Sequence, residues 1–289
     1  MNGVSSRATE RVLEFDVAGD ACLGIVHEAD SPAALGVVLV VGGPQYRVGS
    51  HRQFVLLARA LATAGMTTLR FDYRGMGDSA GEARDFTAID ADVRAAVDTL
   101  VRESGVSKVV IWGLCDAASA ALKYAATDRR VAGLVLLNPW VHSPATEAQV
   151  RLKSYYLSRL RSPELWRKLL RFEFDWRDSL ASLRSYLGAA MVRTPDSKQE
   201  HFITRMRKGW AAFDGPSLLI LSGDDLTAGE FRQLAANDAG WRATMASKRI
   251  ETLHLEAANH TIARAEWRDA VAQATVDWTC ALSKDIDHA

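Results

Sequence analysis

The chain has 289 residues, of which 48% are hydrophobic and 24% charged. This composition is ordinary for a globular protein of one or two domains and excludes disordered and collagen-like chains. Its 35 basic and 35 acidic residues cancel, so no overall field favours nucleic acid or an anionic membrane as a partner.

The first residues, MNGVSSRATERVLEF, contain no apolar core of signal-peptide length, and the longest apolar runs, such as VVLVV, are too short to cross a bilayer. We therefore expect no transmembrane segment and a cytoplasmic location. The three cysteines, Cys22, Cys115 and Cys280, are odd in number and widely spaced. That spacing fits neither a disulfide framework nor a zinc site.

Apolar patterning predicts strands and helices that alternate along the chain. Strands are expected at 12–17, 21–27, 35–41, 66–72, 108–112, 131–138, 216–222 and 250–255, and helices at 51–64, 86–103, 116–126 and 266–282. This order is typical of βαβ units, so it predicts an α/β fold with a mainly parallel sheet and helices on both faces. Such sheets place their chemistry beyond the carboxyl ends of the strands.

The alternation is interrupted between residues 139 and 215, where the pattern is that of amphipathic helices. From Arg151 to Trp210 there are fourteen basic and six acidic residues, a surplus of eight that the rest of the chain balances. The segment also holds four of the eight tryptophans. We expect a core formed by residues 1–138 and 216–289, with 139–215 inserted as a helical cap.

The sequence GLCDA places Cys115 where a strand meets a helix, between Gly113 and Ala117. A Gly-x-nucleophile-x-Gly corner needs small residues on both sides, because its central residue adopts a strained backbone that projects the side chain above the sheet. The start of the following helix would stabilise a thiolate there. Alone, the pattern fits a buried structural cysteine equally well.

Two further strand ends supply the partners that a nucleophile needs, in the order acid and then histidine. GDDLT follows one strand and offers Asp225, with Asp224 as the alternative acid, and ANHT follows the next and offers His260. The carboxylate would orient the imidazole, which would take the proton of the thiol. Because of this order we expect His260 to be the base rather than His27, His51, His142, His201, His254 or His288.

Hydrogen-bond donors for an oxyanion are expected from two loops. The backbone N–H of Asp116, directly after the nucleophile, is one candidate, and the loop VGGPQ after residues 35–41 supplies the other. Pro44 has no N–H, so Gly43 is the first choice and Gln45 the second.

These motifs resemble those of the α/β-hydrolases over the whole chain. VGGPQ is similar to the His-Gly-Gly-Pro oxyanion loop of the proline-iminopeptidase type, and RFDYRGMGDSAG to the Asp-x-x-Gly-x-Gly-x-Ser turn of that type. More narrowly, GGPQYRVGSHRQF, FDYRGMGDS and GLCDAAS resemble the exosortase A system-associated hydrolases of the hydrolase 1 type, found in bacterial gene clusters for exopolysaccharide production and protein sorting.

Three residues depart from the usual pattern. Cysteine replaces serine as nucleophile, as in dienelactone hydrolases, Val41 replaces histidine before the glycines, and Ala117 replaces the second glycine of the corner. A thioester intermediate passes its acyl group readily to thiols, amines or alcohols, so acyl transfer and thioester cleavage join ester hydrolysis as expected reactions. Asp116 is a negative neighbour that opposes thiolate formation unless its side chain turns outward.

Residues around the expected site suggest substrate contacts. Trp140, Tyr155, Tyr156 and Trp166 are candidates to line an acyl pocket, and Arg47, His51 and Arg52 to bind a carboxylate. All of these also fit packing or surface roles. The basic cap suits an anionic group on a small-molecule or carrier-bound acyl substrate, a peripheral membrane surface or a protein partner.

The leading hypothesis is an esterase-like, thioesterase-like or acyltransferase enzyme with Cys115, His260 and Asp225 as its catalytic residues and no metal or organic cofactor. The alternative is a hydrolase-like binding or scaffold protein of an exopolysaccharide or protein-sorting system, in which the fold persists without efficient catalysis.

Overall fold

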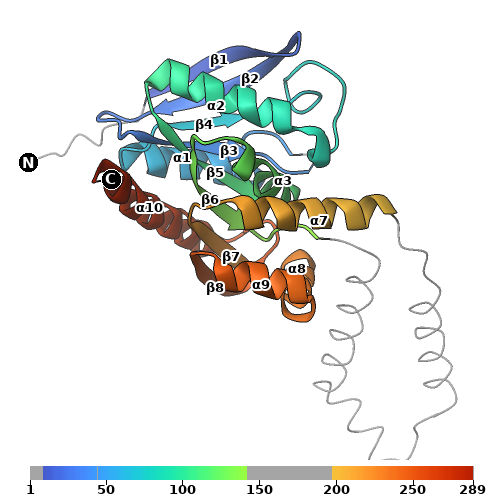
Figure 1. The fold of residues 1–289 in the computed structure, drawn as a ribbon. Helices are drawn as coiled ribbons and strands as arrows, with labels where there is room; N and C mark the ends of the chain where they lie inside the picture. Colours follow the sequence, from blue (N-terminus) through green and yellow to red (C-terminus); the bar gives the residue numbers. More distant parts are fainter. Residues whose placement is uncertain (1–8, 44, 142–196, 289) are drawn as a thin grey trace, which may run out of the picture.

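The computed structural model describes residues 9–43, 45–141 and 197–288 (Figure 1). In this part of the chain the strands form one sheet of order β1-β2-β4-β3-β5-β6-β7-β8. β2 pairs antiparallel with both β1 and β4, and every other pair of neighbouring strands is parallel. The strands are β1 (Thr9–Val17), β2 (Asp20–Glu28), β3 (Leu35–Val40), β4 (Thr68–Phe71), β5 (Lys108–Leu114), β6 (Val131–Leu137), β7 (Ser217–Asp224) and β8 (Ile250–Asn259).

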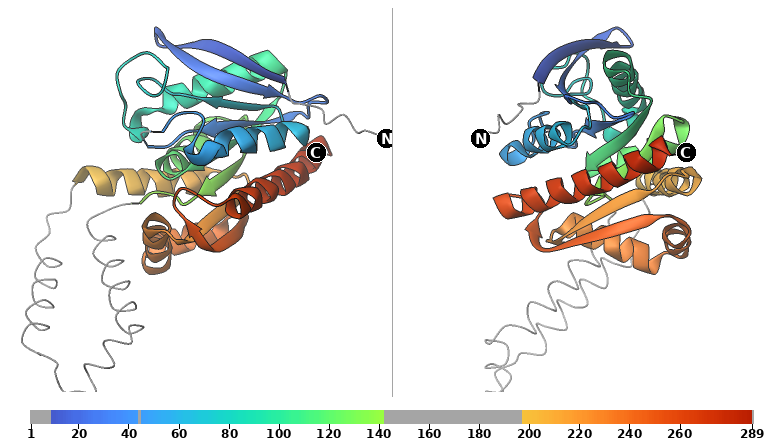
Figure 2. Two further views of the ribbon diagram at one scale, coloured as in Figure 1. Left: turned by 180° about the vertical axis from the view of Figure 1, so that it is seen from behind. Right: turned by 90° about the vertical axis from the view of Figure 1, so that its left-hand side faces the viewer.

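Helices cover both faces of the sheet. α1 and α10 pack on one face, and α2, α3 and α7 on the other (Figures 1 and 2). The helices are α1 (Gln53–Thr63), α2 (Asp90–Ser104), α3 (Asp116–Tyr124), α7 (Ser197–Ala212), α8 (Leu226–Asn237), α9 (Ala239–Ser247) and α10 (Ala265–Asp287), and the 3-10 turns are η1 (Ser50–Arg52), η2 (Phe86–Ala88) and η3 (Ala125–Thr127). The predicted mainly parallel sheet between two helical layers is confirmed.

Strand β3 shows why its sequence is apolar throughout. Val38 and Val40 belong to the core beneath α2 and α3, whereas Val37 and Leu39 belong to the core beneath α1 and α10. Successive side chains of a strand point to opposite faces, so a strand covered on both faces needs apolar residues at every position. Full burial of each such side chain contributes about 1.5–3 kcal/mol.

Two helices between β7 and β8, α8 and α9, were not among the predicted elements. Each begins at an aspartate whose side chain accepts a backbone hydrogen bond, Asp225 from Thr227 N at 2.9 Å and Asp238 from Trp241 N at 2.8 Å. Aspartate is a preferred N-cap residue. The signal for both helices was therefore present in the sequence.

α7 comes from the segment predicted as a cap, but it packs on the core. Gly209 lies so close to the Leu122 carbonyl of α3 that a Cβ would collide with it. Trp210 is fully buried, with ring centroids 6.5 Å from Phe231 and 6.1 Å from Trp241. Residues 142–196 lie outside the described residues, so the 139–215 boundary stays a prediction. None of the described helices combines the length and apolarity needed to span a bilayer.

Candidate active site

Cys115 lies at the corner between β5 and α3 in a conformation that only a few residues adopt. Its φ of 61° and ψ of −123° are unusual for any residue other than glycine, and its side chain is partly exposed. The Cys115 N–H donates to Leu137 O at 2.9 Å, and the Cys115 carbonyl accepts from Trp140 N at 3.2 Å. These bonds to the end of β6 hold the corner in its strained form.

The corner requires small neighbours, as its sequence predicted. A Cβ on Gly113 would lie 2.6 Å from the carbonyl carbon of Ala117 and 2.6 Å from Ala118 N. Ala117 itself is fully buried. β5 and α3 are therefore in backbone contact here, and a larger residue at position 113 would push them apart.

The acid and the histidine meet because of the strand register. β7 and β8 are parallel and place Asp224 opposite Asn259, so that the next residues, Asp225 and His260, emerge side by side. His260 Nδ1 lies 2.9 Å from Asp225 Oδ2. The Asp225 side chain is 3% exposed, whereas Asp224 is an exposed residue. Of the two candidate acids, Asp225 is thus the one that contacts the imidazole.

The His260 ring also hydrogen-bonds the Cys115 side chain. Because a carboxylate only accepts, Nδ1 carries the proton facing Asp225, which leaves Nε2 for the thiol. The hydrogen bond with Asp225 and then that with Cys115 raise the pKa of His260 to about 10, against the effect of burial. An imidazolium that has taken the proton of the thiol is therefore stabilised by both partners.

The two expected oxyanion donors, Gly43 N and Asp116 N, both bond the Asp116 side chain, which the sequence marks only as an unfavourable charge near the thiol. The carboxylate of Asp116 turns toward the end of β3, and its Oδ2 accepts from Gly43 N at 2.9 Å. Its Oδ1 accepts from Ala117 N at 2.9 Å, and the Asp116 N–H also bonds its own carboxylate. Gln45 is partly buried, and its Oε1 has no hydrogen-bond partner among the described residues.

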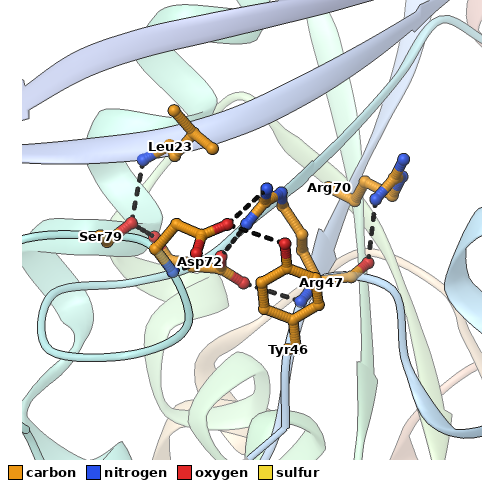
Figure 3. A network of polar contacts seen from close by, with 7 residues as sticks. Leu23, Tyr46, Arg47, Arg70, Asp72 and Ser79 are labelled. Carbon is orange, nitrogen blue, oxygen red and sulfur yellow. Dashed lines mark hydrogen bonds and ion pairs between the residues drawn. The ribbon is translucent and has the colours of Figure 1, made fainter.

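Arg47 lies in the same loop and is held by carboxylates (Figure 3). Its N–H donates to Asp72 Oδ1 at 2.7 Å, and its guanidinium forms ion pairs with Asp72 and, at 2.8 Å, with Asp78. Burial lowers the pKa of Arg47, but the bonds to Asp78 and Asp72 outweigh burial and raise that pKa above its ordinary value. Its guanidinium therefore joins the loop after β3 to the turn after β4.

Asp72 opens that turn and explains its sequence pattern. It also accepts from Asp78 N at 3.2 Å, and its carbonyl accepts from the Ser79 hydroxyl at 2.6 Å (Figure 3). A Cβ on Gly77, whose φ is +53°, would collide with the Asp72 carboxylate. The Asp-x-x-Gly-x-Gly-x-Ser turn thus supports the loop after β3.

The other expected contact residues differ in position. His51 and Arg52 are exposed, and both have φ near 60° in the short turn before α1. Trp140 is partly buried beside the corner and stacks on Phe202, with centroids 5.3 Å apart and planes at 15°. Tyr155, Tyr156 and Trp166 lie outside the described residues.

Asn138 and Ser222 are residues that the sequence did not single out. Asn138 is fully buried at the end of β6, where its Nδ2 donates to Ser222 Oγ at 2.9 Å and its Oδ1 accepts from Ser222 N at 2.8 Å. The pair ties the loop that carries Trp140 to the strand that leads to Asp225. Asn138 has a φ of 48°, which asparagine tolerates better than most residues.

Other histidines of the described chain lie apart from this constellation. His27 is buried and accepts from Arg70 Nε at 2.8 Å, and burial lowers its pKa to about 4. His254 is exposed on β8. Among the described residues, no three His, Cys, Asp or Glu side chains gather in a way that could hold a metal ion.

Comparisons with known proteins agree with this architecture. A family model described as the alpha/beta hydrolase fold matches residues 37–161. The esterase Pf2001 of Pyrococcus furiosus superposes with a TM-score of 0.61 at 16% identity, over 92% of this chain and 90% of the esterase. A proline iminopeptidase of Mycobacterium smegmatis superposes with a TM-score of 0.62 at 14% identity, over 96% and 100%. The chain has the α/β-hydrolase fold, as predicted.

Curated relatives share a shorter region. The uncharacterized protein PA2218 of Pseudomonas aeruginosa is 32% identical over 102 residues, which are 34% of this chain and 27% of that protein. The polyketide transferase grgF of a Penicillium species is 31% identical over 96 residues, 30% of this chain and 31% of the transferase. The matches thus span less than a third of either relative.

Proposed function

We propose that this chain, on its α/β-hydrolase fold, cleaves or transfers acyl groups of an ester or thioester through a covalent intermediate on Cys115. His260 is the base and Asp225 orients it. One observation carries the proposal: a cysteine at a strained strand-to-helix corner hydrogen-bonds an imidazole whose other nitrogen is bonded to a buried carboxylate.

The reaction proceeds in two balanced halves. His260 takes the proton of the Cys115 thiol, and the sulfur attacks the acyl carbon to form a tetrahedral oxyanion. As that intermediate collapses, the bond to the leaving alcohol or thiol breaks and the imidazolium returns the proton to it. Water or another acceptor then gives its proton to His260 and attacks the thioester, and the Cys115 sulfur leaves and recovers the proton.

Cysteine as the nucleophile favours acceptors other than water. Its thioester intermediate is more reactive toward thiols and amines than an oxygen ester would be, so acyl transfer competes with hydrolysis. The matches to a polyketide transferase and to an esterase support these two outcomes respectively. Product analysis with and without an added thiol or amine acceptor separates transferase from hydrolase.

The substrate contacts of this proposal extend to the loops around Cys115. Trp140 adjoins the corner and serves as one wall of the acyl site, with Tyr155 as a second candidate. Arg52 is an exposed cation and His51 an exposed imidazole, and both could bind an anionic group on the substrate. The motifs that resemble those of the exosortase A system-associated hydrolases support a role for the chain in exopolysaccharide or protein-sorting chemistry.

The test is covalent trapping with phenyl thioacetate or a chloromethyl ketone, followed by peptide mapping. Cys115 is expected to carry the adduct, because burial raises the pKa of Cys22 to about 11 and Cys280 lies against the Ala64 carbonyl. Cys280→Ser is the matched control and should label normally. An adduct on Cys22 or Cys280 in preference to Cys115 would contradict the proposal.

One observation favours the second candidate, a hydrolase-like binding or scaffold protein. The Asp116 carboxylate already accepts the Gly43 N–H on which oxyanion stabilisation depends. Iodoacetamide alkylation of Cys115 across pH distinguishes the two candidates. If the protein is an enzyme, His260→Ala must change the pH dependence of Cys115 alkylation. An unchanged pH dependence favours the scaffold protein.

A further inference from the structure

The Asp116 carboxylate lies between the loop after β3 and the start of α3. The carboxylate spans from the start of α3 to the end of β3, with Oδ2 on Gly43 N and Oδ1 on Ala117 N, both at 2.9 Å. The residue at position 42 must be glycine here, because a Cβ would collide with Asp116 Oδ1 and with the Leu114 carbonyl. The carboxylate therefore fills the gap between the loop and the corner.

An oxyanion and this carboxylate need the same donors. The tetrahedral intermediate places a negative oxygen within hydrogen-bond distance of backbone N–H groups that point at it. The oxygens of Asp116 accept hydrogen bonds from such groups and belong to the residue next to Cys115. One backbone N–H donates well to only one acceptor, so an oxyanion can bind Gly43 N only after the Asp116 oxygen has left it.

We infer that Asp116 is a specificity-determining residue that occupies the oxyanion position of the free protein and is displaced only by acyl donors that bind well elsewhere in the site. This inference rests on the proposed function of Cys115. Small activated esters and thioesters acylate Cys115 slowly, because they make too few contacts with the protein to offset the free energy of displacing the carboxylate.

The test compares two reactions of the same sulfur. Alkylation by iodoacetamide needs the thiolate but forms no oxyanion, whereas acylation by phenyl thioacetate needs both. Mass spectrometry of the Cys115 peptide gives both rates, and their ratio removes the effect of the Asp116 charge on thiolate formation. Asp116→Asn removes the charge but keeps an oxygen that can accept from Gly43 N. Asp116→Ala removes the charge and vacates the position.

Asp116→Ala is expected to raise the ratio of acylation to alkylation at least tenfold, while Asp116→Asn stays within twofold of the unmodified protein. Asp116→Ser should behave like Asp116→Ala, because its side chain is too short to reach Gly43 N. Its hydroxyl can still accept a hydrogen bond at the start of α3, so this variant replaces Asp116→Ala if the alanine variant folds poorly. Circular dichroism checks the fold of each protein.

Other outcomes overturn the inference. An unchanged or lower ratio in Asp116→Ala and Asp116→Ser means that the carboxylate holds the Gly43 loop in place for catalysis. A rise in Asp116→Asn equal to that in Asp116→Ala means that charge, not occupancy, is responsible. Acylation of the unmodified protein in either case leaves the proposed function intact, whereas alkylation without acylation in every variant contradicts both.

Discussion

Asp225 and His260 directly follow the neighbouring parallel strands β7 and β8, and Asp225 Oδ2 lies 2.9 Å from His260 Nδ1. The same carboxylate uses Oδ1 to accept from Thr227 N at the start of α8. Asp225 therefore has both of its oxygens fixed by groups on rigid elements. This fixes the carboxylate rotamer, and with it the direction in which the imidazole faces Cys115.

Replacing Asp225 with asparagine is expected to lower the pKa of His260, because the bond with this carboxylate is the largest cause of its elevation. The amide still caps α8 but favours the wrong tautomer of the ring, so we expect acylation of Cys115 to slow by about 10²- to 10⁴-fold. Two-dimensional ¹H–¹⁵N spectra of the imidazole measure the titration, and thioester trapping measures the rate.

Asp224→Asn is the matched control, since Asp224 is exposed and one residue away. It should leave both the titration and the rate unchanged. Equal effects of the two substitutions would mean that the acid is not Asp225 alone.

The raised pKa of His260 also predicts a pH dependence of folding stability. The ordinary pKa of 6.5 rises to about 10 in the folded protein, so the folded state holds a proton that the unfolded chain has released. The stabilisation is complete below pH 6.5 and is lost as pH rises toward 10. Urea unfolding from pH 6 to 10.5 should therefore show a difference between the unmodified protein and Asp225→Asn that shrinks with rising pH. A difference that grows over this range would contradict the assignment.

The positions of the catalytic candidates could be predicted because they follow from chain order. Cys115, Asp225 and His260 each come directly after a strand whose apolar pattern is plain, and the ends of parallel strands meet at one edge of a sheet. The strained corner was also predictable, since Gly113 and Ala117 are small for a reason that the backbone contact explains.

Side-chain directions in the loops were not predictable in the same way. The sequence left open whether Asp116 turns outward, and only the path of the loop after β3 brings Gly43 N within 2.9 Å of it. The sequence left Arg47 open to a substrate carboxylate or to a capping and surface role, and it did not predict the ion pair with Asp72, because the spacing of residues 47 and 72 carries no periodic signal. Asn138 and Ser222 are 84 residues apart and meet only across strands.

Arg47→Met is expected to destabilise the protein by about 3–5 kcal/mol, because it keeps the apolar stem but leaves the buried Asp72 carboxylate without its cation. Acylation should slow as well, since the oxyanion loop loses its tie to the turn after β4. Urea unfolding and thioester trapping measure these effects.

Arg52→Met, five residues away in an exposed position, is the control and should change stability by no more than about 0.5 kcal/mol. If Arg47→Met changed stability as little as Arg52→Met and weakened only the binding of anionic substrates, Arg47 would contact the substrate directly instead of supporting the loop.

Asn138 allows backbone strain to be separated from hydrogen bonding. Asn138→Gly removes both bonds to Ser222 but suits the φ of 48°, so we expect a loss of about 1–3 kcal/mol from the buried groups left unpaired. Asn138→Ala should cost about 1–2 kcal/mol more, because alanine resists positive φ. In the Asn138→Gly background, Ser222→Ala should add less than it does alone, since the hydroxyl has already lost the amide. Additive losses in urea unfolding would show that the two side chains act independently, and the tie between β6 and β7 would then lie in the backbone bond from Asn138 N to Ile220 O.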